Sequence, residues 1–322
     1  MENMISFIYS FDKNYNFQAF ISIMSLLEKV NEKINIFILH NNKNSFSHFL
    51  ETIEKNKFLN LIVIEELEFS DFIFSNTDNK HVTEATYYRL FLDRAFEKYE
   101  DELKNVVYLD ADIVCKNNPI PYAIQVFKEL TNSNKLVAAR TEILNIHRNY
   151  EFFDKFDNNN SVKYFNAGVL YFDYKFWIEN SIFNKTREML NRKDLDFEFW
   201  DQDLLNNFFE GNYLEISNLS NFALNVKWHI QKKTLDQSIF IHYQGNRKPW
   251  HIANALKESS IYFHDEVKKF HNKSIYLSST GLRNDIYGFF KTLLSVKSYK
   301  NPYFADYLKE SILIMFKNLI NF

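Results

Sequence analysis

The stretch Val106-Val107-Tyr108-Leu109-Asp110-Ala111-Asp112 joins a short run of strand-forming residues to two aspartates that a single small residue separates. Side chains on an extended chain point to the same side every second residue, so Asp110 and Asp112 are expected on one side, roughly 6–7 Å apart. Two acids at the end of a buried strand are costly unless a cation neutralises them, and the next basic residue is Lys116. The stretch therefore predicts a cation site at a strand end, with two solvated acids in a loop as the alternative.

Length and composition bound the class of protein. With 322 residues, the chain can form one large α/β domain with an appendage, which we favour, or two domains. The net charge of −3 provides no basic field, so no nucleic-acid partner is expected. The single cysteine, Cys115, excludes an internal disulfide framework and fits a reducing compartment. Neither a secretory signal nor a membrane-spanning apolar run is evident, so we expect a cytoplasmic protein.

The scarcity of glycine excludes two kinds of nucleotide site. The chain has only five glycines, and their spacing cannot form a G-x-G-x-x-G cradle or a Walker-type loop. A nucleotide would have to be held without a glycine-rich phosphate loop.

The first 110 residues alternate between strand and helix patterns. Phe17, Phe20, Ile21, Met24 and Leu27 show the helical spacing that follows the first strand. The alternation predicts a mostly parallel sheet with helices on both faces, whose ligands lie outside the carboxyl ends of the strands. The predicted strands cover residues 4–9, 34–39, 61–65 and 105–110, and later helices cover 47–56 and 84–96.

The second half of the domain carries more polar residues at the ends of predicted elements. A strand over 164–172 contains Asn166 and Gly168, where either a close approach to a ligand or a β-bulge would require glycine. Asp201 lies in the first turn of a helix, which by itself is favourable helix-dipole chemistry. A strand over 239–241 ends at His242, for which a purely structural role is the alternative. A further strand is predicted over 136–140, and the polar stretch 145–163 is predicted to be a mobile lid.

The C-terminal part changes in character. From residue 268 onward, nine basic residues face only three acids. We therefore divide the chain into residues 1–262 and a basic, aromatic-rich helical tail, 263–322. The tail's last helix either docks on the main domain or lies on an anionic membrane, on the cytoplasmic face of the inner membrane. Its apolar stripe comprises Phe304, Leu308, Ile312, Met315, Phe316, Leu319 and Ile320.

Four segments in a fixed order support a family resemblance. They are residues 10–15, 108–112, 165–168 with Asp201-Gln202-Asp203, and 242–250. Their Y-L-D-x-D, F-N-A-G-V, W-D-Q-D and H-Y-x-G-x-x-K-P-W patterns resemble glycosyltransferase family 8, especially its bacterial lipopolysaccharide galactosyl- and glucosyltransferases, over about residues 4–255. The resemblance implies a GT-A fold, a divalent metal that is usually Mn²⁺, a UDP-sugar donor and retention of configuration at the anomeric carbon.

The resemblance also implies a metal and nucleotide site. Asp110, Asp112 and His242 match the metal ligands, a mixed oxygen and nitrogen set that suits Mn²⁺. The family's uridine pocket is matched by four residues, with the ring of Tyr15 stacking on the base and the carboxylate of Asp12 accepting a hydrogen bond from it. The four are Ser10, Asp12, Asn14 and Tyr15.

Further positions match the family's diphosphate and sugar contacts. Arg89 matches an arginine near the donor, although a helix-surface pair with Asp93 is the alternative. Gly245 and Lys248 match the segment that folds over the diphosphate, beside Asp110-Ala111-Asp112. The positions around the transferred sugar are matched by Asn166, Asp201 and Gln202.

The expected chemistry is cleavage of a glycosyl–phosphate bond. Negative charge then develops on the departing UDP, where a metal and a fixed cation stabilise the transition state. Asp201 and Gln202 are the candidates on the opposite face of the sugar, but an amide is a poor nucleophile. We favour attack from the face that UDP leaves, with a phosphate oxygen taking the acceptor's proton.

One position departs from the galactosyltransferase type. That type carries an aspartate on the donor sugar after the strand ending at Arg140, whereas this chain has Thr141 followed by Glu142. The hexose is therefore open, and Glu142 could substitute if the loop shifts by one residue.

The expected function is transfer of a hexose from a UDP-sugar to a saccharide or glycolipid acceptor, in bacterial surface polysaccharide synthesis. One alternative is a metal-dependent nucleotidyltransferase, although such enzymes usually have a glycine-rich basic loop that residues 10–15 do not provide. The other is a catalytically degenerate protein that only binds a sugar nucleotide.

Overall fold

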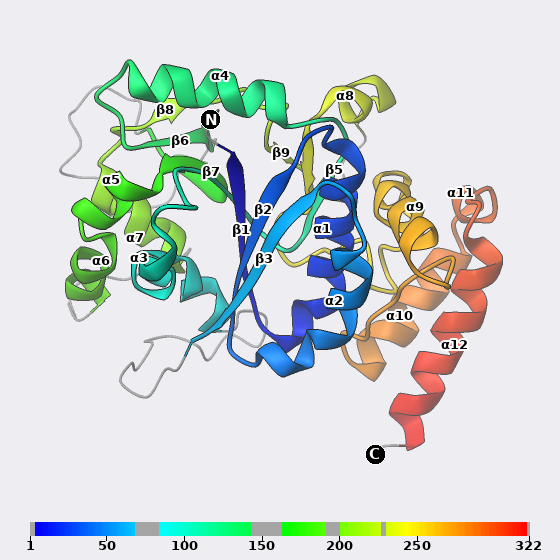
Figure 1. Cartoon of the computed structure of the whole chain (residues 1–322). Coiled ribbons are helices and arrows are strands. Elements are labelled where there is room, and N and C mark those ends of the chain that lie inside the picture. The colour runs from blue at the N-terminus through cyan, green and yellow to red at the C-terminus, as the bar shows by residue number, and fades with distance from the viewer. Residues whose placement is uncertain (1–3, 68–83, 143–162, 191–199, 227–229, 321–322) are drawn as a thin grey trace.

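A seven-stranded sheet runs through the centre of the molecule, in the order β3-β2-β1-β4-β7-β6-β8 (Figure 1). The structure, a computed structural model, describes residues 4–67, 84–142, 163–190, 200–226 and 230–320. The strands of the sheet are β1 (Ile5–Phe11), β2 (Ile34–His40), β3 (Leu59–Glu66), β4 (Asn105–Leu109), β6 (Val137–Thr141), β7 (Phe165–Asp173) and β8 (Leu214–Glu215).

The sheet is mostly parallel, as the alternating pattern predicts. The strands β3, β2, β1 and β4 pair in parallel, and β8 is parallel to β6. Only β7 runs against its neighbours β4 and β6 in this sheet of the described residues. The carboxyl ends of β1, β2 and β4 therefore meet at one edge, where Phe11 pairs with His40.

Each central strand is buried on both faces. Val107 and Leu109 belong to one hydrophobic cluster, while Val106 and Tyr108 belong to a second one, because successive side chains of β4 point to opposite faces. The first cluster includes residues of α1 (Asn16–Lys29), α2 (Ser47–Glu54), α4 (Ile120–Thr131) and α9 (Ile261–Phe270). The second includes residues of α3 (Leu92–Ala95), α5 (Tyr174–Glu179), α6 (Ile182–Leu190) and α7 (Trp200–Phe209).

The helix predicted over 84–96 differs from the structure. Residues 84–91 form a 3₁₀ helix, η3 (Glu84–Phe91), and only the short α3 follows it. Tyr87, Tyr88 and Leu90 are all almost fully buried in the second cluster. Burial on several sides, rather than helix propensity, decides the conformation here.

A second, three-stranded sheet lies beside the carboxyl edge. It comprises β5 (Ile113–Cys115), β10 (Phe240–His242) and β9 (Phe222–Ala223), in the order β5-β10-β9. The strand predicted to continue through Asp110 ends instead at Leu109, and the chain turns at Ala111 and Asp112 before entering β5. The pairing of His242 with Ile113 then places β10 directly after the aspartates. Cys115 is buried there, in the first hydrophobic cluster.

The C-terminal helices pack together on the outer side of α9 (Figure 1). They are α10 (Leu282–Leu293), α11 (Val296–Tyr299) and α12 (Phe304–Ile320), and a short α8 (Lys232–Gln237) precedes β10. A third hydrophobic cluster joins residues 252–256 to Phe289 of α10 and Tyr307 of α12. The division at residue 262 falls inside α9, whose Phe263 and Val267 pack in the first cluster.

The predicted apolar stripe of the last helix is split by this packing. Phe304, Leu308 and Met315 pack against the third cluster, whereas Ile312, Phe316, Leu319 and Ile320 are exposed. The fully buried positions on α12 are Tyr307 and Ser311, which the stripe did not include. The prediction of one continuous apolar face was wrong, because the helix docks along a different line. The predicted lid at 145–163 lies outside the described residues except for Lys163.

Candidate active site

Asp110, Asp112 and His242 meet at the carboxyl end of β4. One potential ligand atom from each lies within 4.8 Å of the others. The His242 Nε2 atom is 3.4 Å from Asp112 Oδ1 and 3.7 Å from Asp110 Oδ2. Asp112 Oδ1 is buried and has no hydrogen-bond partner among the described residues. Carboxylate oxygens and an imidazole nitrogen that converge in this way fit a divalent cation such as Mn²⁺.

Two basic side chains flank the aspartates. Lys248 Nζ contacts Asp112 Oδ2 and donates to the carbonyl of Tyr243 at 2.7 Å, while Arg89 Nη2 lies 3.0 Å from Asp110 Oδ1. Burial opposes charge on both partners of the first pair. The attraction between them nevertheless raises the pKa of Lys248 and lowers the pKa of Asp112. The end of the strand is therefore a compact set of buried charges.

Arg89 also binds a second acid from a distant helix. Its Nε atom lies 2.5 Å from Asp201 Oδ2, and its Nη1 atom donates to the carbonyl of Ala167. The side chain of Arg89 is 9 % exposed, so the expected alternative of a surface pair with Asp93 is wrong. Burial raises the pKa of Asp201 to about 7, although Arg89 acts in the opposite direction. Asp93 instead accepts a hydrogen bond from the Phe183 amide.

Because Gly168 has no side chain, His242 and Asp110 can lie close to its backbone. A Cβ atom at this position would lie 2.3 Å from His242 Cε1 and 2.9 Å from Asp110 Oδ2. The pairing of β6 with β7 is also irregular between Ala139 and Arg140, opposite this part of β7. The two expectations for Gly168, close approach and a bulge, therefore both apply.

The segment after β1 is tied to the aspartates through Tyr108. The Tyr108 hydroxyl donates to Asp110 Oδ1 at 3.0 Å, so Ser10 Oγ, 2.8 Å away, is the donor to the Tyr108 oxygen. Asp12 is 5 % exposed, and its carboxylate accepts from the backbone and side-chain nitrogens of Asn14. Asp12 thereby caps the short 3₁₀ turn η1 (Lys13–Tyr15).

The segment after β10 lies against the same turn. The ring of Trp250 packs edge-on against the ring of Tyr15, with centroids 6.0 Å apart. Gly245 is exposed and has a φ of 74°, a left-handed conformation that favours glycine. The sequence places the residues of this segment about 230 positions from Tyr15, and the fold brings them together.

The residues expected around the sugar form one hydrogen-bonded group. Gln202 Oε1 accepts from the Ala167 amide at 3.0 Å and from Asn166 Nδ2 at 3.3 Å. Asn166 is 2 % exposed. All fourteen residues singled out for the metal, the nucleotide, the diphosphate and the sugar thus lie on the carboxyl edge or on segments that contact it.

Sequence reasoning missed some polar partners of this group. Asn221 is fully buried and contacts both His242 and Asn166, yet it lies outside every recognised pattern. Tyr164 accepts from Gln202 Nε2 at 3.1 Å. Glu142 Oε2 accepts from Arg140 and from Gln244 Nε2, whereas the Thr141 hydroxyl faces Tyr213. Thr141 is the last residue of β6, and Glu142, which follows it, is directed toward the segment after His242.

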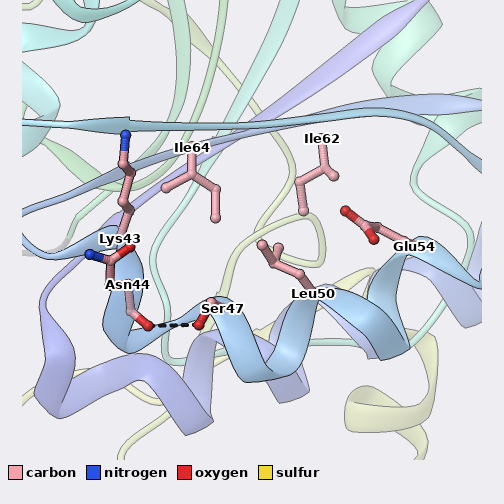
Figure 2. Close-up of a pocket in the computed structure, with 7 residues that line it drawn as sticks. All are labelled: Lys43, Asn44, Ser47, Leu50, Glu54, Ile62 and Ile64. Carbon is pink, nitrogen blue, oxygen red and sulfur yellow. Dashed lines mark hydrogen bonds between the residues drawn. The ribbon is translucent and has the colours of Figure 1, made fainter.

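A separate pocket lies between α2 and β3, away from these residues (Figure 2). Its volume is about 260 Å³, and Leu50, Ile62 and Ile64 form its apolar side. On its helix side, Ser47 Oγ donates to the Asn44 carbonyl at 2.8 Å. None of the residues lining it belongs to the metal, nucleotide or sugar positions, so it takes no part in the site.

Comparison with known proteins agrees with this geometry. A model of the family described as "Glycosyl transferase family 8" matches residues 6–253. A lipopolysaccharide 1,2-glucosyltransferase from Escherichia coli is 26 % identical over 291 residues, covering 82 % of each chain. A lipopolysaccharide 1,3-galactosyltransferase from Salmonella typhimurium is also 26 % identical, over 79 % of this chain and 75 % of its own.

A solved structure shows the fold. The galactosyltransferase LgtC, in complex with donor and acceptor sugar analogs, superposes with a TM-score of 0.65 and 21 % identity over 82 % of this chain and 96 % of its own. This likeness confirms the predicted GT-A architecture with additional C-terminal helices. At this level of identity it speaks for the fold alone.

Proposed function

The chain belongs to glycosyl transferase family 8, and from that premise we propose that it moves a hexose from a UDP-sugar to a saccharide acceptor with retention of configuration. The observation that carries the proposal is the convergence of Asp110, Asp112 and His242 within 4.8 Å. The names of the relatives, lipopolysaccharide glucosyl- and galactosyltransferases, support a glucose or galactose donor and an acceptor in bacterial surface polysaccharide or glycolipid.

The three ligands would hold Mn²⁺ or another divalent cation. A cation there would supply Lewis-acid stabilisation of the diphosphate leaving group. Arg89 and Lys248 add fixed positive charge beside the same aspartates and favour the charge that develops as UDP departs. Gly245, which has no side chain, lets the backbone of this segment approach the diphosphate.

The nucleotide would lie against the turn after β1. Asp12 offers buried carboxylate oxygens, and Tyr15 offers an aromatic ring held edge-on by Trp250. Ser10 and Asn14 border the same turn, and Ala111 lies between the two aspartates. These contacts are proposed for the uridine, with the diphosphate extending toward Asp110 and Asp112.

The hydrogen-bond pattern favours attack from the face that UDP leaves. The carboxylate of Asp201 is 1 % exposed and paired with Arg89, so it is poorly placed to act as a nucleophile. The Gln202 oxygen already accepts two hydrogen bonds, and an amide is a weak nucleophile. We assign Asp201, Gln202 and Asn166 to positioning of the sugar, and a phosphate oxygen of UDP to removal of the acceptor's proton.

Glu142 is proposed to contact the transferred hexose. Its carboxylate is held by Arg140 and by Gln244, which lies two residues after the metal ligand His242. Thr141 is engaged with Tyr213 at 2.7 Å and is the weaker candidate. Because this acid follows one residue later than in the galactosyltransferase type, the choice between glucose and galactose is left to the donor screen.

A donor screen tests the proposal. Purified protein is incubated with UDP-glucose, UDP-galactose or their N-acetyl forms, and UDP release is measured with Mn²⁺ and with EDTA. We expect release from one hexose donor that requires the metal. Binding of UDP-sugars without any release, in the presence of acceptor lipid extracts, would favour the degenerate binding protein, and release of pyrophosphate would favour a nucleotidyltransferase.

The C-terminal helices are proposed to contact an anionic membrane surface. Among the described residues fourteen large hydrophobic side chains are exposed, and eleven of them lie between residues 286 and 320. Basic residues such as Lys291, Lys297 and Lys317 lie among them. No helix in the described ranges is long and apolar enough to cross a membrane. Apolar side chains mixed with lysines suit binding at the surface of anionic lipid, which vesicle sedimentation measures.

The division of the chain into residues 1–262 and 263–322 belongs to the same proposal. Because α9 spans the boundary and packs in the first cluster, point substitutions in α10 to α12 test the membrane role more cleanly than truncation.

A further inference from the structure

We infer that Asn221 is a positioning residue that fixes His242 in the tautomer able to bind a metal, and that it links this ligand to the residues on the sugar side. The inference rests on the proposed metal site, but it assigns a role to a residue outside all the recognised patterns. It is drawn from the direction of five consecutive hydrogen bonds and of two backbone amides that donate to members of that chain.

Strand pairing brings Asn221 to the site. It directly precedes β9, whose Phe222 and Ala223 pair with Ile241 and His242 of β10. Asn221 is 0 % exposed, so both ends of its amide must be satisfied within the protein. Its Oδ1 lies 3.1 Å from His242 Nδ1, and its Nδ2 lies 2.8 Å from Asn166 Oδ1.

Backbone amides determine which end of each side-chain amide is oxygen. The amides of Ala167 and Gly168 can only donate, so the atoms facing them must be Gln202 Oε1, at 3.0 Å, and Asn166 Oδ1, at 3.1 Å. An oxygen on Asn166 requires a donor opposite it, which identifies the nitrogen of Asn221. The Asn221 oxygen then faces His242.

This orientation decides the state of the imidazole. An oxygen opposite Nδ1 requires Nδ1 to carry the proton, and in the neutral ring Nε2 then holds a lone pair. That lone pair faces the carboxylate oxygens of Asp110 and Asp112, which are also acceptors. Three acceptors that converge without a proton between them suit a shared cation, and an acceptor for the N–H of the second ring nitrogen is the usual way to hold a metal-binding histidine.

The hydrogen bonds at the other end of this series run in the same direction. Gln202 Nε2 donates to the Tyr164 hydroxyl at 3.1 Å, and this hydroxyl donates to Asp203 Oδ1 at 2.5 Å. A carboxylate accepts only, so Asp203 fixes the polarity from its side. The second acid of Asp201-Gln202-Asp203 thereby gains a role as the anchor of the chain, while the first one binds Arg89.

Two variants of the full chain, Asn221→Ala and Asn221→Asp, separate the metal role from the sugar role, and a third serves as a control. Asn221→Ala removes both bonds, and we expect the affinity for Mn²⁺ in the presence of UDP to fall about 10- to 100-fold. The affinity is measured from the electron paramagnetic resonance signal of free Mn²⁺. Asn221→Asp keeps an acceptor for His242 but loses the donor to Asn166. We expect it to hold Mn²⁺ within about threefold of the wild type and to turn over about tenfold more slowly.

Asn35→Ala serves as the matched control. Asn35 is also a buried asparagine with side-chain partners, Ser6 and Asn60, but it lies at the amino end of β2. It should lose comparable stability and keep wild-type Mn²⁺ affinity. Wild-type affinity in a folded Asn221→Ala protein would overturn the inference while leaving the proposed function in place. Absence of Mn²⁺ binding in the wild type would overturn both.

A second readout does not need the metal or a folded Asn221→Ala protein. In ¹⁵N-histidine spectra of the wild type, with His242→Ala used for assignment, Nδ1 should carry the proton and Nε2 should not. The opposite tautomer would refute the role given to Asn221.

Discussion

Gly168 and Gly288 both allow a close approach of neighbouring atoms, in two regions of opposite character. At Gly168 an added Cβ would collide with His242 and Asp110, and at Gly288 it would lie 2.6 Å from Ala253 Cβ. The first region is a set of buried charges joined by directional bonds, while the second is an apolar contact between α10 and the segment that follows the active site. The absence of a side chain therefore serves the proposed chemistry at Gly168, where the position of His242 matters. At Gly288 it serves helix docking, and we expect only stability to depend on it.

The largest effect should come from removing a charge at the first region. Asp112→Asn replaces a buried carboxylate oxygen of the proposed metal set and leaves Lys248 without its negative partner. We expect turnover of the UDP-hexose to fall by about 10³-fold or more, measured as UDP release at saturating Mn²⁺. Asp236→Asn, which changes an acid paired with Lys116 far from the site, is the control. Wild-type turnover in Asp112→Asn would show that the metal assignment is wrong.

Gly168→Ala should damage chemistry more than stability. The methyl group would displace His242 by a distance of the order of an ångström, and such a misplacement lowers turnover about 10²-fold. Circular dichroism should still show a folded protein. Undiminished turnover would mean that His242 has room to move and that the two glycines do not differ in the way proposed.

Acid should lower the free energy of unfolding through His264, which lies where α9 meets the C-terminal helices. This histidine of α9 is fully buried beside Tyr303, and burial lowers its pKa to about 3, more than the nearby backbone of Pro249 and Ala255 raises it. Protonation thus favours the unfolded chain. The neutral ring of His264 therefore contributes its full stabilisation of the folded state above the ordinary histidine pKa near 6.5. This contribution is lost as the pH falls toward the folded-state pKa of about 3.

The loss amounts to about 2 kcal/mol at pH 5. His264→Phe should therefore lose about 2 kcal/mol less than the wild type in unfolding free energy between pH 7 and pH 5, whereas His48→Phe, at an exposed position, should follow the wild type. Equal slopes for wild type and His264→Phe, measured by urea unfolding, would contradict the prediction.

Gly288→Ala is the counterpart of Gly168→Ala. Overpacking against Ala253 costs about 1–3 kcal/mol, and the better helix propensity of alanine returns up to about 1 kcal/mol. We expect a net loss near 1 kcal/mol in unfolding free energy and turnover within twofold of the wild type. A loss of turnover as large as that of Gly168→Ala would show that the two regions are coupled.

The smallest effect on the fold should come from the exposed side of α12. Phe316 is 61 % exposed, so Phe316→Ser should change unfolding free energy by no more than about 0.5 kcal/mol and leave UDP release unchanged. Sedimentation with vesicles of anionic lipid should nevertheless decrease, and more so in combination with Leu294→Ser. Ile124→Ser, which removes an exposed apolar side chain outside the C-terminal helices, is the control.

Local sequence patterns predicted the elements well where the burial of a segment follows from its own residues. The strands β1, β2 and β7 begin and end within two residues of their predicted bounds, because short apolar runs rich in β-branched and aromatic residues favour strands buried on both faces. The η3 segment and the stripe of α12 were wrong. There, the line of burial is set by the elements packed against the helix, which periodicity alone does not reveal.

By itself, the sequence determined which residues could carry the chemistry: two aspartates one residue apart after an apolar strand, a histidine after another, and glycine where a side chain would not fit. The tertiary structure decided that Arg89 faces inward between Asp110 and Asp201, that Asn221 stands behind His242, and that only one side of the last helix is docked. The physical reason is that ligand types and strand ends follow from bonds between chain neighbours. Hydrogen-bond direction and helix rotation depend on strand pairings between residues far apart in the chain.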